Sequence, residues 1–286
     1  MDIKIIVCCH KDIIDVRDNI YHPIHVGKAN SGLSLGIPGD DTGDNISEKN
    51  NLYCELTGLY WAWKNIDADF IGLCHYRRFF SFHTKRKSYL FFRMIVQKIK
   101  QFLYVFSPKP KDTYFYYSRY AESNPQRLKK AIVEFENEIV NYLDNNPNTI
   151  AFALKDVNFG MTPNRIVFSK LAGNYHLDVL GEIIKKDHPQ LYPFYQSTLE
   201  SNRLHYANMT IMKKSIMDKY CSFLFDVLEK HLVIIKDRGY IISENEKSIC
   251  RLSGYLGELL TSTFINFLSC SGEGRVELLS QIQYES

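Results

Sequence analysis

Residues Ile3–Cys9 read IKIIVCC, a nearly continuous and largely β-branched apolar run. Such a run is typical of a strand buried on both faces, as in the parallel sheet of an α/β domain. Ligands of open α/β sheets bind beyond the carboxyl ends of the strands. We therefore predict that Cys9, His10 and Lys11, at the end of this strand, meet a nucleotide; an ordinary polar strand exit is the alternative.

The segments that follow extend this prediction. Residues 21–50 are rich in Gly, Asp, Asn and Ser, which predicts a long loop. Apolar residues then recur at helical spacing in Ile46–Ile66, where Ser47 is a candidate N-cap. The next segment, Asp69–Cys74 (DFIGLC), has the pattern of a short strand. The order strand, loop, helix and strand predicts a layered α/β domain.

The later part of the chain alternates between helical and strand patterns. The predicted helices are Leu128–Leu143, His176–Lys185, Ile216–His231 and Arg251–Phe267, and the predicted strands are Thr149–Leu154 and Tyr206–Met212. The sequence shows no internal repeat and no low-complexity tract. We therefore predict one domain over residues 1–286.

Composition narrows the class of protein. A chain of 286 residues with 45% hydrophobic content can bury a sizeable core. Its formal net charge of +3 is too small to indicate a nucleic-acid-binding protein. The 19 Tyr and 18 Phe residues suit sugar faces and membrane interfaces, and a Tyr-rich core is the alternative.

Cysteine usage and hydropathy indicate the compartment. The seven cysteines are odd in number and contain no C-x-x-C pair, which favours reduced core residues of a cytoplasmic protein over a structural zinc site. The N-terminus lacks the basic leader and cleavage region of a signal peptide, and no run of about eighteen apolar residues predicts a membrane span.

One segment has a strongly basic and aromatic character. Residues 79–111 contain eight Lys or Arg and no Asp or Glu, with apolar residues at helical spacing. A basic amphipathic helix of this kind lies in the interface of an anionic bilayer, whereas a helix packed on the domain with a solvated charged face is the alternative. We predict a basic aromatic insertion at about residues 84–120 and a peripheral membrane contact.

The densest polar signal is the segment Gly39–Asn50, GDDTGDNISEKN. Its candidate ligand-binding residues are Asp40, Asp41, Asp44, Asn45, Ser47 and Asn50. Closely spaced carboxylates in a Gly-rich loop supply the hard oxygen ligands that a divalent ion on a diphosphate requires. Asp40, Asp41 and Asp44 are therefore candidate metal ligands, and a solvated acidic loop that leads into the next helix is the alternative.

A second polar signal, His75–Phe80 (HYRRFF), directly follows the predicted strand DFIGLC. Arginines at a strand end neutralise phosphate oxygens through charge-assisted hydrogen bonds, and a histidine donates a hydrogen bond or a proton. His75, Tyr76, Arg77 and Arg78 are thus candidate donor-binding residues. Since adjacent strand residues point to opposite faces, we expect only one of the two arginines to face the ligand. Surface arginines paired with the acidic loop are the alternative.

These segments carry a family resemblance. IKIIVCCHK, GDDTGDNISEKNNLYCELTGLYWAWKN and FIGLCHYRRFF resemble the N-terminal blocks of a bacterial family first catalogued as a domain of unknown function. NMTIMKK, DKYCSFLFDVL and RLSGYLGELL are similar to its later blocks. The central stretch matches only loosely, and the basic insertion is longer than the family leads us to expect.

The resemblance implies a function. Members of the family are associated with capsular and exopolysaccharide synthesis, and some are described as galactosyl- or galactofuranosyltransferases. It implies a GT-A-like fold with a mixed, mainly parallel central sheet flanked by helices. The expected substrates are a UDP-sugar donor and a lipid-linked saccharide acceptor at the inner face of the cytoplasmic membrane, with Mn²⁺ or Mg²⁺ as a candidate cofactor and inversion as the expected course.

Glycosyl transfer also requires a base for the acceptor hydroxyl. The candidates are His176, Asp178, Glu258 and Asp41, although His176 and Glu258 are equally compatible with structural roles. A non-catalytic carbohydrate-binding or scaffold protein is the rival function. A sugar-phosphate or nucleotidyl transferase is a weaker rival, because the sequence contains neither a G-x-G-x-x-G nor a P-loop lysine motif. The sugar, the linkage and the oligomeric state do not follow from the sequence.

Overall fold

The computed structural model describes residues 1–11, 16, 18–83, 119–240 and 249–285. The predicted basic aromatic insertion lies outside the described residues, except for positions 119 and 120. None of the described helices is both long and apolar enough to cross a membrane.

The strands of the described residues form one mixed eight-stranded sheet and a small two-stranded sheet. The main sheet consists of β1 (Ile3–Cys9), β2 (Tyr21–His25), β3 (Phe70–His75), β4 (Arg78–Ser81), β5 (Arg119–Glu122), β6 (Thr149–Leu154), β9 (Thr210–Lys213) and β10 (Arg275–Tyr284), and the small sheet of β7 (Val157–Asn158) and β8 (Arg203–Leu204). The strand order is β2-β1-β3-β4-β10-β6-β9, and β9 also pairs with β3, so that five strands close into a ring.

The main sheet contains both parallel and antiparallel pairs. Strands β2 and β3 pair in parallel with β1, and β5 and β6 pair in parallel with β10. The pairs β3–β4, β4–β10, β3–β9 and β6–β9 are antiparallel. The sheet is therefore mixed, as predicted: among the described strands, β4 and β9 run against the direction of the other six.

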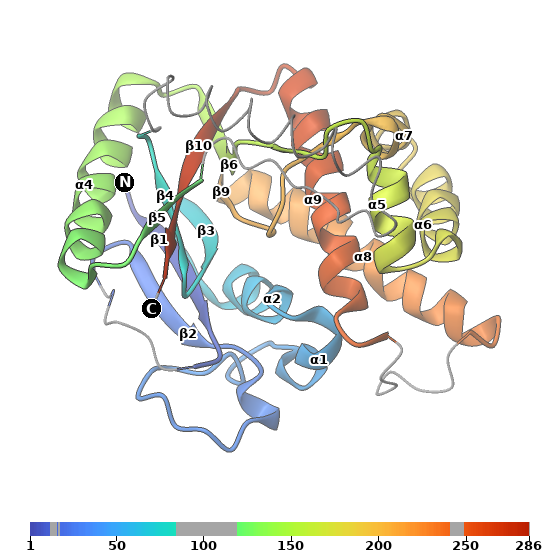
Figure 1. Ribbon diagram of the computed structural model, residues 1–286, viewed down its shortest axis with the longest axis horizontal. Helices are drawn as coiled ribbons and strands as arrows, with labels where there is room; N and C mark the ends of the chain where they lie inside the picture. The colour runs from blue at the N-terminus through green and yellow to red at the C-terminus, as the bar shows by residue number, and fades with distance from the viewer. Residues whose placement is uncertain (12–15, 17, 84–118, 241–248, 286) are drawn as a thin grey trace, which may run out of the picture.

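Helices cover both faces of the sheet (Figure 1). They are α1 (Asn50–Tyr53), α2 (Leu56–Asn65), α4 (Pro125–Asn145), α5 (Asn164–Leu171), α6 (Asn174–Asp187), α7 (Tyr192–Glu200), α8 (Lys214–Asp237) and α9 (Leu252–Cys270), with short 3-10 helices η1 (Lys28–Asn30) and η2 (Ser47–Lys49). Helix α4 lies on one face, and α2, α8 and α9 lie on the other with α5, α6 and α7 beyond them.

Strand β1 shows how the sequence builds these two layers. Its side chains alternate between the faces of the sheet: Ile5 and Val7 join the core under α4, whereas Ile6 and Cys8 join the core under α2, α8 and α9. Every one of these four side chains is buried. The apolar run in the sequence therefore reflects burial on both faces, as predicted.

The predicted helix Ile46–Ile66 is broken at Cys54, whose φ of 51° ends α1 before α2 begins. Ser47 is not an N-cap, because its hydroxyl donates to the buried Asp40 carboxylate. Helix α2 packs closely on the sheet through Gly58, where a Cβ atom would lie 2.9 Å from the sulfur of Cys8. The break leaves the segment between α1 and α2 facing the end of β1.

The predicted strand Tyr206–Met212 is shorter than expected, because β9 begins only at Thr210. Ala207 and Asn208 precede it with φ values of 67° and 53°, which are incompatible with a strand. Strands β2 and β10 and helices α5 and α7 have no counterpart among the predicted elements.

Candidate active site

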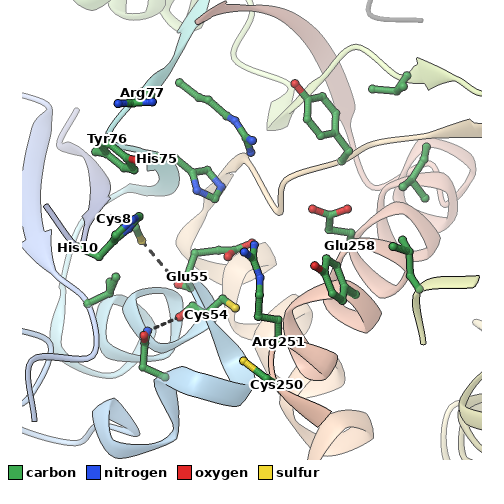
Figure 2. A pocket seen from close by; sticks show the side chains of 18 of the residues that line it. Cys8, His10, Cys54, Glu55, His75, Tyr76, Arg77, Cys250, Arg251 and Glu258 are labelled. Atoms are coloured by element: carbon green, nitrogen blue, oxygen red, sulfur yellow. Dashed lines mark hydrogen bonds between the residues drawn. The ribbon is translucent and has the colours of Figure 1, made fainter. Parts of the chain in front are cut away.

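A cavity of about 760 Å³ opens at the carboxyl ends of β1 and β3 (Figure 2). Its charged, polar and aromatic lining includes His10, Asn50, Glu55, His75, Tyr76, Arg77, Arg78, Tyr206, Arg251, Tyr255 and Glu258. The buried apolar side chains of Val157, Val167, Phe168 and Leu204 form another part of the wall. The cavity lies where open α/β sheets bind their ligands.

Parallel pairing of β1 with β3 brings His10 close to Tyr76 at one edge of the sheet. Cys8 pairs with His75, so the residues after the two strands emerge side by side. The ring of His10 contacts the ring of Tyr76 edge to face, with 4.9 Å between centroids. The sequence prediction that His10, His75 and Tyr76 share a site is compatible with this arrangement.

The hairpin between β3 and β4 places two arginines. His75 pairs with Arg78, so Tyr76 and Arg77 form the two-residue turn between the strands. Arg77 is therefore not a strand residue, and the alternation that predicted opposite faces does not apply to it. Both Arg77 and Arg78 belong to the cavity lining, and the expectation that only one of them faces the donor stays a prediction.

Three arginines of the cavity wall each lie beside a tyrosine ring. The distances from the guanidinium carbon to the ring centroid are 5.3 Å for Arg77 and Tyr76, 5.7 Å for Arg78 and Tyr206, and 5.5 Å for Arg251 and Tyr255. Cation–π contact within about 6 Å restrains a guanidinium without neutralising its charge. The wall therefore presents three oriented cations to the cavity.

Two carboxylates face these cations. Glu55 lies at the break between α1 and α2, and Glu258 lies on α9. Figure 2 shows the Arg251 side chain extending towards Glu55, with Glu258 facing the same space. The cavity thus combines positive groups suited to an anionic ligand with two carboxylates.

The protonation behaviour of Glu258 is unusual. Burial and, to a smaller extent, the nearby Glu55 carboxylate raise the pKa of Glu258 to about 7, although Arg78, the backbone N–H of Ala207 and Arg251 oppose the shift. A carboxyl with a pKa near the working pH is suited to accept and return a proton.

His75 is held in one tautomer. Its Nε2 lies 2.8 Å from the carbonyl oxygen of Ala207, and since a carbonyl only accepts, Nε2 carries the hydrogen. Burial lowers the pKa of His75, and Arg78 and His10 add to this effect while Glu55 opposes it. His75 is therefore a neutral donor fixed in the wall.

The structure leaves several predicted site residues outside the cavity lining. These are Cys9, Lys11, Asp40, Asp41, Asp44, Asn45, Ser47, His176 and Asp178. Cys9 is on the wrong face of β1: it joins the core under α4, and Cys8 lines the cavity instead. Lys11 is exposed beyond the end of the strand.

The acidic loop has a structural role at its centre. The buried Asp40 carboxylate accepts hydrogen bonds from the backbone N–H groups of Gly27 and Lys28, at 3.0 and 3.1 Å, and from the hydroxyl of Ser47. Asp44 is exposed and accepts from Tyr60 at 3.2 Å.

Asp41 is exposed, and Asn45 bonds within the loop, accepting from the backbone N–H of Ser47 at 3.1 Å. The three aspartates therefore do not converge, and no group of three potential metal ligands occurs among the described residues. Asn50 does line the cavity, but its amide donates to Cys54 and Thr57.

Two of the candidate bases lie on α6, away from the cavity. His176 Nδ1 is 3.0 Å from Nε2 of the buried His231, and Asp178 pairs with Arg165 at 3.8 Å. These contacts give both residues structural partners. Of the four candidate bases, only Glu258 lines the cavity.

Sequence reasoning missed Glu55, Arg251, Tyr206 and Tyr255. Glu55 falls inside the continuous helix that the sequence predicts over Ile46–Ile66, and the positive φ of Cys54, which interrupts that helix, has no clear sequence signal. Arg251 and Tyr255 belong to RLSGYLGELL, a block quoted above for its family resemblance, so that block was a usable signal.

The comparison with family models decides the classification. Residues 4–268 match the model of a family described as a domain of unknown function, DUF4422. The chain belongs to this family. The predicted resemblance is thereby confirmed for DUF4422, and the matched range includes every residue named above as lining the cavity.

A solved structure supports the fold of this DUF4422 chain. It resembles a structure titled as the apo form of the bifunctional glycosyltransferase WbbM, with a TM-score of 0.77 and 26% sequence identity over 100% of the present chain. The match covers 46% of that protein, so the chain spans less than half of its length. The mixed α/β fold is thus similar to that of a glycosyltransferase. No match was found among curated proteins.

Proposed function

We propose that this chain is a glycosyltransferase of the GT-A type that moves a sugar from a UDP-linked donor to an acceptor hydroxyl. The observation that carries the proposal is one cavity whose lining includes Arg77, Arg78, Arg251 and Glu258, with Arg78 and Arg251 close enough to act on the Glu258 carboxylate. Three cations suit the two phosphates of the donor, and a carboxyl of raised pKa suits the acceptor proton. The likeness to WbbM supports the same reaction class.

The reaction follows from this arrangement. The Glu258 carboxylate takes the proton of the acceptor hydroxyl as its oxygen bonds to the anomeric carbon of the donor. The bond from that carbon to the diphosphate breaks, and its electron pair leaves with UDP. The arginines stabilise the negative charge that develops on the leaving diphosphate. A single base of this kind fits the inverting course that we propose.

The finer assignments rest on the family resemblance. Our preferred donor is UDP-galactofuranose or UDP-galactose, and our preferred acceptor is a lipid-linked oligosaccharide of capsule, exopolysaccharide or O-antigen synthesis. The basic aromatic stretch at residues 84–120 supports a position on the inner face of the cytoplasmic membrane. Mn²⁺ or Mg²⁺ is proposed as a companion of the diphosphate; the separated aspartates of the acidic loop give it no shared site.

A nucleotide panel tests this proposal. We expect UDP to stabilise the protein selectively over GDP, CMP and dTDP by RT ln(1 + [L]/Kd), and Arg78→Ala to weaken that stabilisation. Each nucleotide is measured with and without Mn²⁺, which decides whether a metal contributes. Release of UDP from UDP-sugars in the presence of acceptor then measures turnover. Absence of any nucleotide effect at millimolar concentration would favour the rival function, a non-catalytic carbohydrate-binding scaffold.

A further inference from the structure

Glu55 lies in the middle of the cavity, and the reaction proposed above gives it no role. It follows Cys54, whose φ of 51° ends α1, and it directly precedes α2. Figure 2 shows its side chain between His75 and Glu258, with the Arg251 side chain extending towards it. Glu55 is close enough to act electrostatically on both His75 and Glu258. Its carboxylate therefore faces the space in which we place the reaction.

The backbone around Glu55 is held in one position. The backbone carbonyl of Glu55 accepts from the N–H of Leu59 at 3.2 Å and from the thiol of Cys8 at 3.6 Å. The carbonyl of Cys54 accepts from Nδ2 of Asn50 at 2.7 Å. A non-glycine residue with a positive φ, such as Cys54, persists only where its surroundings hold it in place. The break between α1 and α2 therefore presents Glu55 at a defined position.

The side chain of Glu55 is fixed at one of its two oxygens. Nδ2 of the fully buried Asn208 donates to Oε1 of Glu55 at 2.8 Å. The same nitrogen lies 3.3 Å from the backbone carbonyl of Gly254, which only accepts. These two acceptors determine the orientation of the Asn208 amide, because its nitrogen and not its oxygen must face them. The Asn208 amide is therefore a fixed donor at Oε1.

The second oxygen of Glu55 is open to a ligand. Among the residues that the structure describes, none donates a hydrogen bond to Oε2. A carboxylate oxygen only accepts, so the ligand group that meets it must be a donor. The phosphates of a nucleotide sugar offer acceptors, whereas the hydroxyls of its sugar and of its ribose donate. Glu55 is thus suited to a hydroxyl of one of these two rings.

The neighbours of Glu55 favour the transferred sugar over the ribose. In the proposed reaction Arg77 and Arg78 hold the diphosphate and Glu258 meets the acceptor hydroxyl, so the anomeric carbon lies between these groups. Glu55 is near Glu258, whereas both phosphates separate the ribose from the anomeric carbon. The ring that reaches Glu55 is therefore the one that carries the anomeric carbon.

We propose that Glu55 is a specificity-determining residue, whose Oε2 accepts a hydrogen bond from a hydroxyl of the transferred sugar while Asn208 holds the carboxylate in place. The inference rests on the proposed glycosyl transfer and deepens it by naming the residue that recognises the sugar. The substrate class is a hexosyl donor with a free hydroxyl at the contacted carbon. A site built to bind a hydroxyl rejects an analogue that lacks it, because the acceptor in the wall is then left without a donor.

Two variants of Glu55 test the inference. Glu55→Ala removes the acceptor altogether, and it also leaves the Asn208 amide without its partner. Glu55→Gln keeps that contact, because the amide nitrogen of Asn208 still requires an acceptor and so orients the carboxamide oxygen towards itself. The NH2 group of the glutamine then faces the cavity, where a donor replaces the acceptor. Glu55→Gln therefore remains informative where Glu55→Ala folds poorly.

The readout is the Kd of UDP and of a UDP-sugar, measured by calorimetry at pH 8. The UDP-sugar is whichever of UDP-galactose, UDP-galactofuranose and UDP-glucose the unmodified protein binds most tightly. We expect its Kd to rise about 10- to 100-fold in Glu55→Ala and about 10-fold in Glu55→Gln, while the Kd of UDP stays unchanged in both. An equal rise for UDP would assign Glu55 to the ribose, and an unchanged Kd for the UDP-sugar would leave Glu55 without a contact; either result would overturn the inference.

Monodeoxy analogues of the same UDP-sugar identify the contact without relying on one variant. In the unmodified protein, the analogue that lacks the contacted hydroxyl should bind about 10- to 100-fold more weakly than the parent sugar. In Glu55→Ala the same analogue and the parent should bind equally, because the two changes remove one interaction. A penalty that persists in Glu55→Ala would show that another residue recognises this hydroxyl and would refute the role of Glu55.

Two glutamates serve as matched controls. Glu200→Gln alters an exposed glutamate at the end of α7, outside the cavity lining, and should leave every Kd unchanged. Glu258→Gln should lower kcat and keep the Kd of the UDP-sugar close to its original value, the reverse of the pattern expected for Glu55.

The same measurements separate this inference from the proposed function. Transfer of a sugar with no response to the Glu55 variants would keep the transferase and remove the role of Glu55. Selective loss of UDP-sugar binding in those variants, without any transfer, would keep that role and remove the transferase. A protein that binds no UDP-sugar would remove both.

Discussion

Replacing Glu258 with glutamine should strongly lower the rate of sugar transfer while making the protein more stable at alkaline pH. Glutamine has nearly the same shape, so the change removes only the ability to ionise. In the native protein burial and the neighbouring Glu55 hold the pKa of Glu258 at about 7, against an ordinary value of 4.5. As the pH rises through 7, this raised pKa should therefore increase kcat/KM and decrease the stability of the fold.

The catalytic consequence follows from the ionised fraction. With a pKa of about 7, roughly a tenth of the Glu258 carboxyls are ionised at pH 6 and roughly nine-tenths at pH 8. We therefore expect kcat/KM to rise about tenfold between these two pH values. Loss of a positioned general base lowers the rate by about 10²–10⁴-fold, and the residual rate of Glu258→Gln should no longer show this limb.

The consequence for stability follows from proton linkage. Because the folded-state pKa of Glu258 lies above its ordinary value, the folded protein keeps a proton that the unfolded chain releases. This contribution to stability is complete below pH 4.5 and is lost as the pH rises through 7. It amounts to at most about 3 kcal/mol at one pKa unit per 1.36 kcal/mol.

Turnover of UDP-sugar and thermal unfolding, each measured from pH 4 to 9, provide the assay. Glu258→Gln should keep only a low residual rate without the acidic limb, should match the native melting temperature at pH 4 and should exceed it at pH 8. A variant that keeps the acidic limb would show that another group is the base. A variant that melts earlier at pH 8 would show that Glu258 stabilises the fold when ionised, contrary to our reasoning.

Three further predictions concern the charges of the molecule. Arg78→Ala and Arg251→Ala should each lower kcat/KM about 10- to 100-fold through loss of a charge-assisted contact of about 1.5–3 kcal/mol, whereas Arg203→Ala, an exposed arginine outside the cavity, should not. Asp40→Ala should lower the free energy of unfolding, measured in urea, by about 3 kcal/mol with or without Mn²⁺, because it leaves buried donors without an acceptor. A loss of stability seen only with Mn²⁺ would show that Asp40 binds the metal. Burial and His176 hold the pKa of His231 at about 3, so the contribution of neutral His231 to stability is present above the ordinary value of 6.5 and is lost as the pH falls towards 3. In thermal unfolding, His231→Leu should therefore flatten the decline of stability between pH 7 and 4. An equally steep decline would contradict this.

The sequence was informative wherever a pattern reflects burial on regular elements. Strand β1 and the strand before His75 follow directly from apolar runs, and their parallel pairing brings His10 and His75 to one edge. The alternation of side chains along β1 also predicts that Cys8 and Cys9 lie on opposite faces, because Cys8 shares its face with Ile6 and Cys9 shares its face with Val7. The folded structure was needed only to show which of the two faces lies towards the cavity.

The acidic loop shows what composition cannot decide. A cluster of aspartates is equally compatible with metal binding and with internal hydrogen bonding, and the difference lies in partners distant in sequence. Asp40 is occupied by backbone N–H groups of Gly27 and Lys28, twelve or more residues away. The same limit applies to His176, whose partner His231 lies 55 residues along the chain on α8.

The residues that give the cavity its chemistry lie where the regular patterns break. Cys54 interrupts an otherwise good helical repeat and thereby turns Glu55 into the cavity, and Ala207 and Asn208 delay β9 while presenting two peptide groups and an amide to the site. A pattern of apolar residues predicts the continuation of an element, so it misses such breaks by construction. Strained backbone of this kind has a free-energy cost, and its persistence beside Glu55, Glu258 and His75 is therefore evidence for function that is independent of any family resemblance.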